Sequence, residues 1–291
     1  MTSLALVTKS YRGDFELCRD LCASVDRHMP AIPHYLLVDR ADRQLFAPLA
    51  SSTRTIVPCD ALLPQFREID LPGRRLWWQP PWRFVRGWIH QQLAKIAFVA
   101  GMVEDAAVHI DSDITFIAPL PQANVFEGGR VRLLRNPGGG QAAQHDRWHR
   151  IAQQLLSLPV TGYSGCDYIG PGVVWSPAQV RAMISRIEHA TGMQWFDALA
   201  HHFRFSEYLL YGNFCDHVAD PGGAPMPSGD WRFCHMSWGH DLAGEEGIER
   251  FVAALGPQHA CVLIQSNLGL SHVRRAAIMR RIELRRKQFG R

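Results

Sequence analysis

Two aspartates lie in an otherwise apolar stretch, AAVHIDSDITFI, at residues 106–117. Asp111 and Asp113 are separated only by Ser112, and residues two apart on an extended chain point to the same side. A carboxylate inside a buried strand costs several kcal/mol unless a partner compensates it. We therefore expect residues 106–110 to form a buried strand and the two acids to lie at its end, facing one cleft.

Two carboxylates in one cleft are suited to a hard cation such as Mg²⁺ or Mn²⁺. A cation held there can bind a diphosphate and neutralise the charge that develops on a departing phosphate oxygen. The alternative is a polar strand end with solvated acids, because a short D-x-D pattern also arises by chance. The segments around Asp111 and Asp113 are needed to choose between a metal site and a solvated strand end.

Strands and helices alternate through the first half of the chain. Strand patterns cover SLALVTKS, HYLLVDR and TRTIVPC, and helical patterns cover DFELCRDLCASVDRH and WRFVRGWIHQQLAKIAFVAGM. Before the long helix, PQFREIDLPGRRLWWQPPW is expected to be a loop. The repeated order of strand and helix predicts an α/β fold on a mostly parallel sheet flanked by helices. Ligands of such sheets gather at the carboxyl ends of the strands.

The second half is less regular, and no linker rich in serine and proline divides it from the first. We expect one compact domain over residues 1–270, followed by a basic helix over residues 271–291. Residues 272–291 contain eight Lys or Arg and one Glu, so they carry +7 and the remainder carries 4 − 7 = −3. Such a helix is suited to contact an anionic membrane surface or to pair with the acidic body.

The composition also narrows the compartment and the class of protein. The seven cysteines are scattered and form no C-x-x-C pair, which favours a reducing compartment. The first residues resemble a buried strand rather than a signal peptide, and no apolar run approaches the roughly 20 residues of a membrane span. We expect a cytoplasmic protein, at most peripheral at the inner face of the cell membrane. Dinucleotide and P-loop glycine motifs are lacking, and no motif indicates nucleic acid.

The order of helix, apolar strand, D-S-D and ITFIAPL resembles the metal-binding motif of glycosyltransferases with the GT-A fold. GWIHQQLAKIAFV, FSEYLLYG and the opening ALVTKSYRGDFELCRDLCASVD are similar to segments of a bacterial glycosyltransferase-like family. The resemblance runs from about residue 3 to about residue 218, although each motif is short. It implies a Rossmann-like GT-A fold and a nucleotide-sugar donor, and it leaves the product open.

The resemblance also implies residues that bind the donor. The end of the first strand commonly meets the nucleotide in GT-A folds, and Gln91 and Lys95 share one face of the helix before the acidic strand. Gly172, in YIGPGVVWS, would let the backbone approach the donor sugar. Each of these positions also has a structural explanation, such as an exposed helix face or a bulged strand. The expected donor-binding residues are Thr8, Lys9, Ser10, Tyr11, Gln91, Lys95, Asp111, Ser112, Asp113 and Gly172.

Acceptor and catalytic residues are expected later in the GT-A order. Glu207 could act as general base or orient the acceptor hydroxyl, or it could simply support a helix N-terminus capped by Ser206. Asp230 is a second candidate base. Aromatic faces stack on sugar rings, so the expected acceptor contacts are Trp77, Trp78, Tyr208 and Tyr211, whereas Trp88 is expected to cover the core.

Some GT-A enzymes complete the metal site with a late histidine, for which His235 and, after it, His240 are the candidates. The sequence thus predicts a metal-dependent glycosyltransferase that transfers a sugar to a bacterial surface polysaccharide or its lipid-linked precursor. Two alternatives stay open. One is a metal-dependent nucleotidyltransferase or phosphohydrolase that uses Asp111 and Asp113. The other is a non-catalytic carbohydrate-binding protein on a GT-A scaffold.

Overall fold

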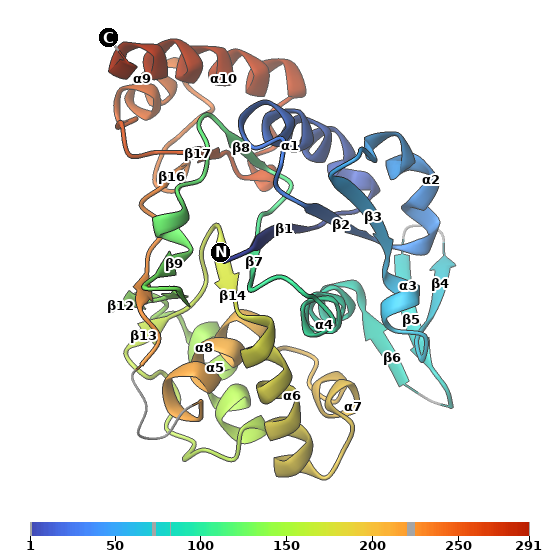
Figure 1. The fold of residues 1–291 in the computed structure, drawn as a ribbon. Coiled ribbons are helices and arrows are strands. Elements are labelled where there is room, and N and C mark those ends of the chain that lie inside the picture. Colours follow the sequence, from blue (N-terminus) through green and yellow to red (C-terminus); the bar gives the residue numbers. More distant parts are fainter. Residues whose placement is uncertain (1, 72–73, 82, 220–224, 291) are drawn as a thin grey trace.

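A computed structural model describes residues 2–71, 74–81, 83–219 and 225–290. At its centre is a five-stranded sheet in the order β14-β7-β1-β2-β3 (Figure 1). Strands β7, β1, β2 and β3 run parallel, and β14 is antiparallel to β7. The mostly parallel sheet predicted from the sequence is therefore confirmed. Its strands are β1 (Leu4–Lys9), β2 (His34–Val38), β3 (Arg54–Pro58), β7 (Ala106–His109) and β14 (Val173–Trp175).

Alternation along β1 explains why helices cover both faces of this sheet. Leu4 and Leu6 join one apolar cluster with Leu21 of α1 (Phe15–His28). Ala5 and Val7 point to the other face, where they join the cluster that contains Leu93 of α4 (Gly87–Ala100). Figure 1 shows α1 and α4 on opposite sides of β1. Successive residues of a strand face opposite ways, so an apolar run such as Leu4–Val7 requires cover on both faces.

Further helices surround this core. Below the sheet in Figure 1, α5, α6, α7 and α8 pack with α4 as one layer. The helices of this layer are α5 (Ala143–Leu155), α6 (Pro177–Thr191), α7 (Trp195–Ala200) and α8 (Glu207–His217). Two short helices beside β3 are α2 (Arg43–Phe46) and α3 (Cys59–Leu62). Pro177 is the first residue of α6. The predicted Ser206 cap of α8 is confirmed, since the Ser206 hydroxyl accepts the Leu209 N–H at 3.4 Å.

The segment expected to be a loop contains two strands of a three-stranded antiparallel sheet, and the third strand falls where the long helix was expected to begin. The sheet comprises β4 (Arg67–Leu71), β5 (Arg74–Gln79) and β6 (Arg83–Arg86), and Pro80 and Pro81 lie at the turn between β5 and β6. Both predictions were wrong here, because these strands are stabilised by pairing with one another rather than by a pattern within one segment. Pairing with β4 and β6, together with burial of Trp77, stabilises β5 as a strand.

The C-terminal part forms a second sheet and a pair of helices. The sheet has the order β16-β17-β8, with β8 (Ile114–Phe116), β16 (Cys234–Met236) and β17 (Cys261–Leu263). The pair is α9 (Glu245–Ala253) and α10 (His272–Lys287), which lie together at the top of Figure 1. Ile278 and Ile282 of the expected basic helix are buried against Ile248 and Phe251, so α10 is packed into the same compact domain.

Short elements complete the fold. The remaining strand pairs are β9 (Phe126–Glu127) with β10 (Arg130–Val131), β11 (Leu133–Leu134) with β15 (Ser228–Gly229), and β12 (Asn136–Pro137) with β13 (Cys166–Asp167). The 3-10 turns are η1 (Arg12–Asp14), η2 (Arg40–Asp42), η3 (Ala47–Leu49), η4 (Gln122–Asn124), η5 (Ser266–Leu268) and η6 (Gln288–Gly290). Within the described ranges, no helix combines the length and the apolar character needed to cross a bilayer.

Candidate functional site

A cavity of about 730 Å³ opens at the carboxyl ends of β1, β2 and β7. It contains eight residues that the sequence predicted for a donor or acceptor site, and it adds others from η1, β5, α4 and η5. Its lining consists of Lys9, Ser10, Tyr11, Arg12, Asp14, Asp39, Arg75, Trp77, Gly87, Trp88, Gln91, Asp111, Ser112, Asp113 and Ser266. The expectation that Asp111 and Asp113 face a cleft at a strand end is confirmed.

The two acids sit on a tight turn between β7 and β8. The Ile114 N–H donates to the Asp111 carbonyl at 3.1 Å and closes the turn. Asp111 is exposed in the cavity, whereas Asp113 is half-buried. One Asp113 oxygen, Oδ2, accepts the backbone N–H of Ser266 at 2.8 Å. Between the acids, the buried Ser112 hydroxyl donates to the Ser10 hydroxyl at 2.9 Å and ties the turn to the end of β1.

Negative charge is crowded at this turn. Burial, and next the nearby Asp111 carboxylate, raise the pKa of Asp113 to about 6. The pKa of Asp14, which also lines the cavity, is raised by burial and by Asp111. The positive charge of Arg275 lowers the pKa of both acids. Its guanidinium, however, donates a hydrogen bond to the Ile264 carbonyl at 2.6 Å rather than to either carboxylate. Asp111, Asp113 and Asp14 therefore form a region of concentrated negative charge on one wall of the cavity.

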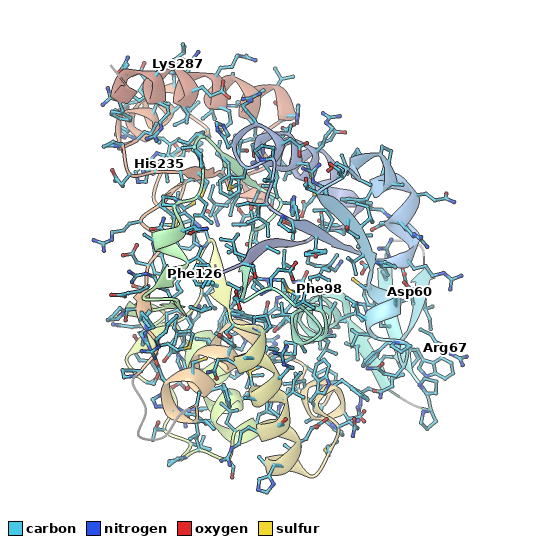
Figure 2. The ribbon with its side chains drawn as sticks, in the orientation of Figure 1. Asp60, Arg67, Phe98, Phe126, His235 and Lys287 are labelled. Atoms are coloured by element: carbon cyan, nitrogen blue, oxygen red, sulfur yellow. The ribbon has the colours of Figure 1, made fainter. Side chains whose placement is uncertain are left out.

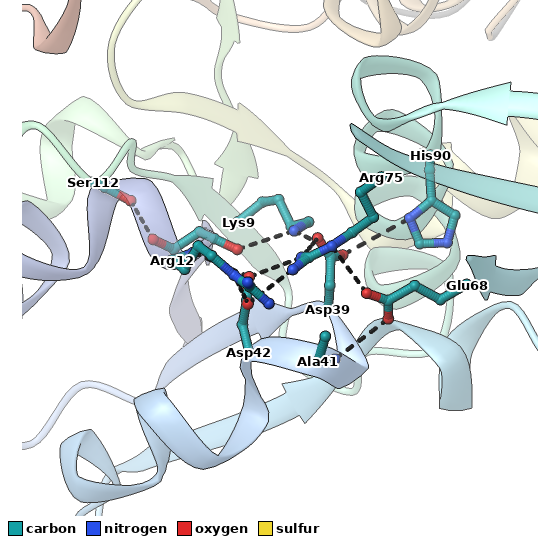
Figure 3. A network of polar contacts seen from close by, with 10 residues as sticks. Lys9, Arg12, Asp39, Ala41, Asp42, Glu68, Arg75, His90 and Ser112 are labelled. Atoms are coloured by element: carbon teal, nitrogen blue, oxygen red, sulfur yellow. Dashed lines mark hydrogen bonds and ion pairs between the residues drawn. The ribbon is translucent and has the colours of Figure 1, made fainter. Parts of the chain in front are cut away.

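An ionic network fixes the opposite wall (Figure 3). Lys9 pairs with Asp39 at 3.0 Å, and Arg75 contacts Asp39 at 3.2 Å and Asp42 at 2.9 Å. Burial alone would raise the pKa of Asp42, but hydrogen bonds from Arg75 and Arg12 hold it at about 2. Arg75 belongs to β5, so the network joins the β4-β5-β6 sheet to the ends of β1 and β2. The sequence did not point to Asp39 as a site residue, although it lies near the end of the predicted strand HYLLVDR and directly follows β2 at the same edge.

Aromatic side chains form the remaining walls. Tyr11 is 50% exposed and Trp88 40% exposed, while Trp77 is buried and stacks on His90 at a centroid distance of 4.3 Å. The prediction that Trp88 covers the core was wrong, because the helix begins at Gly87 and leaves this first turn beside the cavity. Trp78 does not line the cavity. It alternates to the other face of β5 and packs against Arg67.

Lys95 and Glu207 meet as a buried ion pair instead of lining the cavity. The Lys95 ammonium lies 3.1 Å from the Glu207 carboxylate and donates to the Tyr208 hydroxyl at 2.9 Å. The Glu207 N–H donates to the amide oxygen of Gln92, whose own N–H₂ binds the Trp88 carbonyl. Glu207 lies in the first turn of α8, where the structural alternative placed it, and it also joins α8 to α4, a contact that the sequence did not predict.

Several other predicted residues lie apart from the cavity. Thr8 is fully buried and hydrogen-bonds His34 at 3.0 Å. Tyr211 is fully buried and accepts the Ser176 N–H. Gly172 has a φ of 69°, a conformation that favours glycine, and a Cβ at this position would clash with the Phe233 ring. Its lack of a side chain is therefore explained by backbone conformation and core packing.

The remaining polar candidates lie farther along the chain. Asp230 is exposed and pairs with Arg232. His235, which Figure 2 labels, is buried. Its Nε2 lies 2.7 Å from the Phe251 carbonyl of α9, and its ring stacks on the Phe251 ring. Burial lowers the pKa of His235 to about 4. His240 lies near it, with ring centroids 6.2 Å apart. Neither histidine lines the cavity with Asp111 and Asp113, and the described residues contain no metal-ready group of three or more His, Cys, Asp or Glu.

The fold and the cavity define an α/β protein with a ligand-sized site at the carboxyl edge of a mostly parallel sheet. The chain belongs to a family of unknown function, DUF6492, whose model matches residues 2–220. The matched segment includes every cavity residue except Ser266. No curated protein matches the chain.

Proposed function

We propose that this protein is a metal-dependent glycosyltransferase that uses a nucleotide-sugar donor. The observation that carries the proposal is the cavity itself. Two carboxylates of one turn, Asp111 and Asp113, face a space of about 730 Å³ whose other walls are aromatic and hydrogen-bonding. Ligand cavities commonly have volumes of about 300–1,000 Å³. The resemblance of the D-S-D segment to the metal-binding motif of GT-A glycosyltransferases, whose acids hold the cation of a nucleotide-sugar, supports the same assignment.

The donor set fits a hard divalent cation. Mg²⁺ is often held by one or two carboxylates and completes its coordination with water and substrate phosphates. Asp111 is exposed to the cavity, and Asp113 is half-buried with its Oδ2 engaged by the Ser266 N–H. A cation between them would offset the burial and the repulsion from Asp111 that together raise the pKa of Asp113. Bound there, Mn²⁺ or Mg²⁺ would neutralise charge on the departing diphosphate.

The surrounding residues would bind and orient the donor. Tyr11 and Trp88 present exposed rings on which a base or a sugar can stack. Lys9 and Asp39 hold each other in place at the ends of β1 and β2, and Gln91 supplies an amide from α4. In the reaction, the acceptor hydroxyl oxygen bonds to the anomeric carbon. The bond from that carbon to the phosphate oxygen breaks, its electron pair leaves with the nucleoside diphosphate, and the hydroxyl proton is released to water.

The proposed acceptor is a bacterial surface polysaccharide or its lipid-linked precursor, and the proposed location is the cytoplasm, at the inner face of the membrane. Nucleotide transfer or phosphate hydrolysis would use the same acids, and a non-catalytic protein would bind carbohydrate without the cation. These alternatives predict different ligands. A nucleotidyltransferase or phosphohydrolase would consume nucleoside triphosphates or phosphate esters. For a non-catalytic carbohydrate-binding protein, Mn²⁺ would have no effect on carbohydrate binding.

The test is a thermal-shift and calorimetric screen of nucleoside diphosphates and nucleotide-sugars, with and without Mn²⁺. A ligand that binds only the folded protein raises its melting temperature, and we expect a shift that requires Mn²⁺. Asp113→Asn should abolish it, while Asn can still accept the Ser266 N–H. Asp241→Asn is the matched control, because Asp241 is exposed and also accepts a backbone N–H, that of Ala243 at 2.9 Å. Loss of binding in the control, or equal binding by Asp113→Asn, contradicts the proposal.

A further inference from the structure

A second hollow, of about 370 Å³, lies on the other side of Trp88 from the cavity. It is formed where β6, the start of α4, α5 and the segment before α8 converge. Its charged and aromatic lining residues are Arg86, Arg147, Arg204, Trp88, Trp148 and Phe203. Because Trp88 lines both spaces, a molecule in the hollow would be adjacent to a donor in the cavity.

The hollow carries positive charge without a counter-charge. Arg86, Arg147 and Arg204 are exposed, and across the described chain none of the three has an acidic or hydrogen-bonding side-chain partner. Other arginines nearby are paired: Arg83 with Asp197 at 2.8 Å and Arg150 with Asp146 at 2.8 Å. Three guanidiniums around one space match carboxylate or phosphate oxygens, which they can bind in a bidentate manner.

Aromatic surface accompanies this charge. Phe203 is 69% exposed and Trp88 40% exposed, and Trp148 lies beside Trp88 with ring centroids 5.7 Å apart at 33°. Exposed aromatic side chains of this size next to a cavity indicate a contact surface rather than core packing. The faces of these rings are suited to stack on a sugar ring, while the guanidiniums select for a negative substituent on it.

We propose that the hollow binds an anionic saccharide, a sugar ring that carries a carboxylate or a phosphate, as the acceptor of the transfer. This inference rests on the proposed glycosyltransferase function and names its acceptor class. An acceptor held by Arg147 and Arg204 would place a hydroxyl near the shared wall at Trp88, beside the donor sugar. Transfer then forms the bond from that hydroxyl oxygen to the anomeric carbon and releases the nucleoside diphosphate, as described above.

Saccharide binding should be measured by calorimetry and by saturation-transfer NMR on the full chain. The probes are a tetrasaccharide of glucuronic acid and N-acetylglucosamine, its carboxyl-reduced neutral analogue, and galactose 6-phosphate. We expect binding of at least one anionic probe, weakening as salt rises because exposed charges are screened. The neutral analogue should bind about tenfold more weakly or worse, because it lacks the charged hydrogen bonds. The stronger of the two anionic probes identifies carboxylate or phosphate as the preferred group.

The double variant Arg147→Gln/Arg204→Gln should bind the anionic probe about tenfold more weakly or worse. The single variant Phe203→Ala should also bind it more weakly. Arg280→Gln, an exposed arginine of α10, is the matched control and should change nothing. Circular dichroism confirms folding of each variant. The inference is overturned if no anionic probe binds, if the neutral analogue binds as well, or if the double variant binds like the wild type.

The same proteins are titrated with Mn²⁺ and a nucleoside diphosphate, so that the two proposals fail separately. The double variant should retain this binding, because Arg147 and Arg204 lie outside the cavity. Nucleotide binding without saccharide binding overturns the acceptor inference and supports the donor site. Saccharide binding without Mn²⁺-dependent nucleotide binding overturns both the proposed function and the acceptor role of the hollow.

Discussion

Glu207→Gln separates a structural ion pair from a catalytic base. Lys95 and Glu207 are 9% and 6% exposed in their side chains and lie 3.1 Å apart. At an effective dielectric constant of about 20, their attraction is about 332/(20 × 3.1), or ~5 kcal/mol, much of it offset by the cost of removing both charges from water. Neutralising Glu207 leaves the Lys95 charge buried with the Tyr208 hydroxyl as its remaining strong acceptor.

Removing one member of a buried pair costs about 3–5 kcal/mol. The Gln amide can still accept from Lys95, so we expect a loss near the lower end, about 3 kcal/mol in the free energy of unfolding. Urea denaturation of the wild type, Glu207→Gln, Lys95→Met and the double variant measures it. The double variant should be less destabilised than the sum of the single ones by about 2 kcal/mol, since residues in one ion pair are coupled.

The control is Glu246→Gln, which removes an exposed i,i+4 pair with Arg250 on α9. Exposed pairs contribute about 0.2–1 kcal/mol, so this variant should stay close to the wild type. The reasoning is refuted if Glu207→Gln costs no more than the control, or if the single effects of Lys95 and Glu207 simply add. A stable Glu207→Gln protein that has lost sugar transfer would instead restore the catalytic interpretation.

Two further predictions concern charge. The folded pKa of Asp113, about 6, lies above its ordinary value of 3.8, so its contribution to stability is full below about pH 4 and is lost as the pH rises through 6. Metal-free Asp113→Asn should therefore be more stable than the wild type at pH 7 by about 2 kcal/mol in the free energy of unfolding. Urea titrations should show that this difference disappears near pH 4. A variant that is less stable than the wild type at pH 7 contradicts the prediction. On α10, Arg280→Glu/Lys287→Glu should weaken sedimentation with anionic vesicles in low salt, because Ile282 is buried and the exposed charges must supply the attraction; unchanged sedimentation contradicts a membrane contact.

Local patterns in the sequence were sufficient for the central sheet and the acidic turn. Apolar runs such as Leu4–Val7 and Ala106–Ile110 predict strands buried on both faces, and the helical pattern between them predicts a parallel arrangement. Once the strands are parallel, their carboxyl ends share one edge. Asp111, Asp113 and the residues after Lys9 were therefore expected at the same edge, whereas their closeness depends on the pairing of β1 with β7, which only the structure shows.

Tertiary structure alone decided which polar groups meet. Lys95 and Glu207 are 112 residues apart, and the Ser266 N–H reaches Asp113 across 153 residues. Such contacts cannot be predicted from a periodic pattern in the sequence, because each is made by a single side chain or N–H. The same holds for β5, because pairing with β4 and β6 decides that this segment is a strand and that residue 77, not residue 78, faces the cavity. A strand's period is set by its own backbone, whereas the partner of a buried charge is set by which distant segments the folded core brings together.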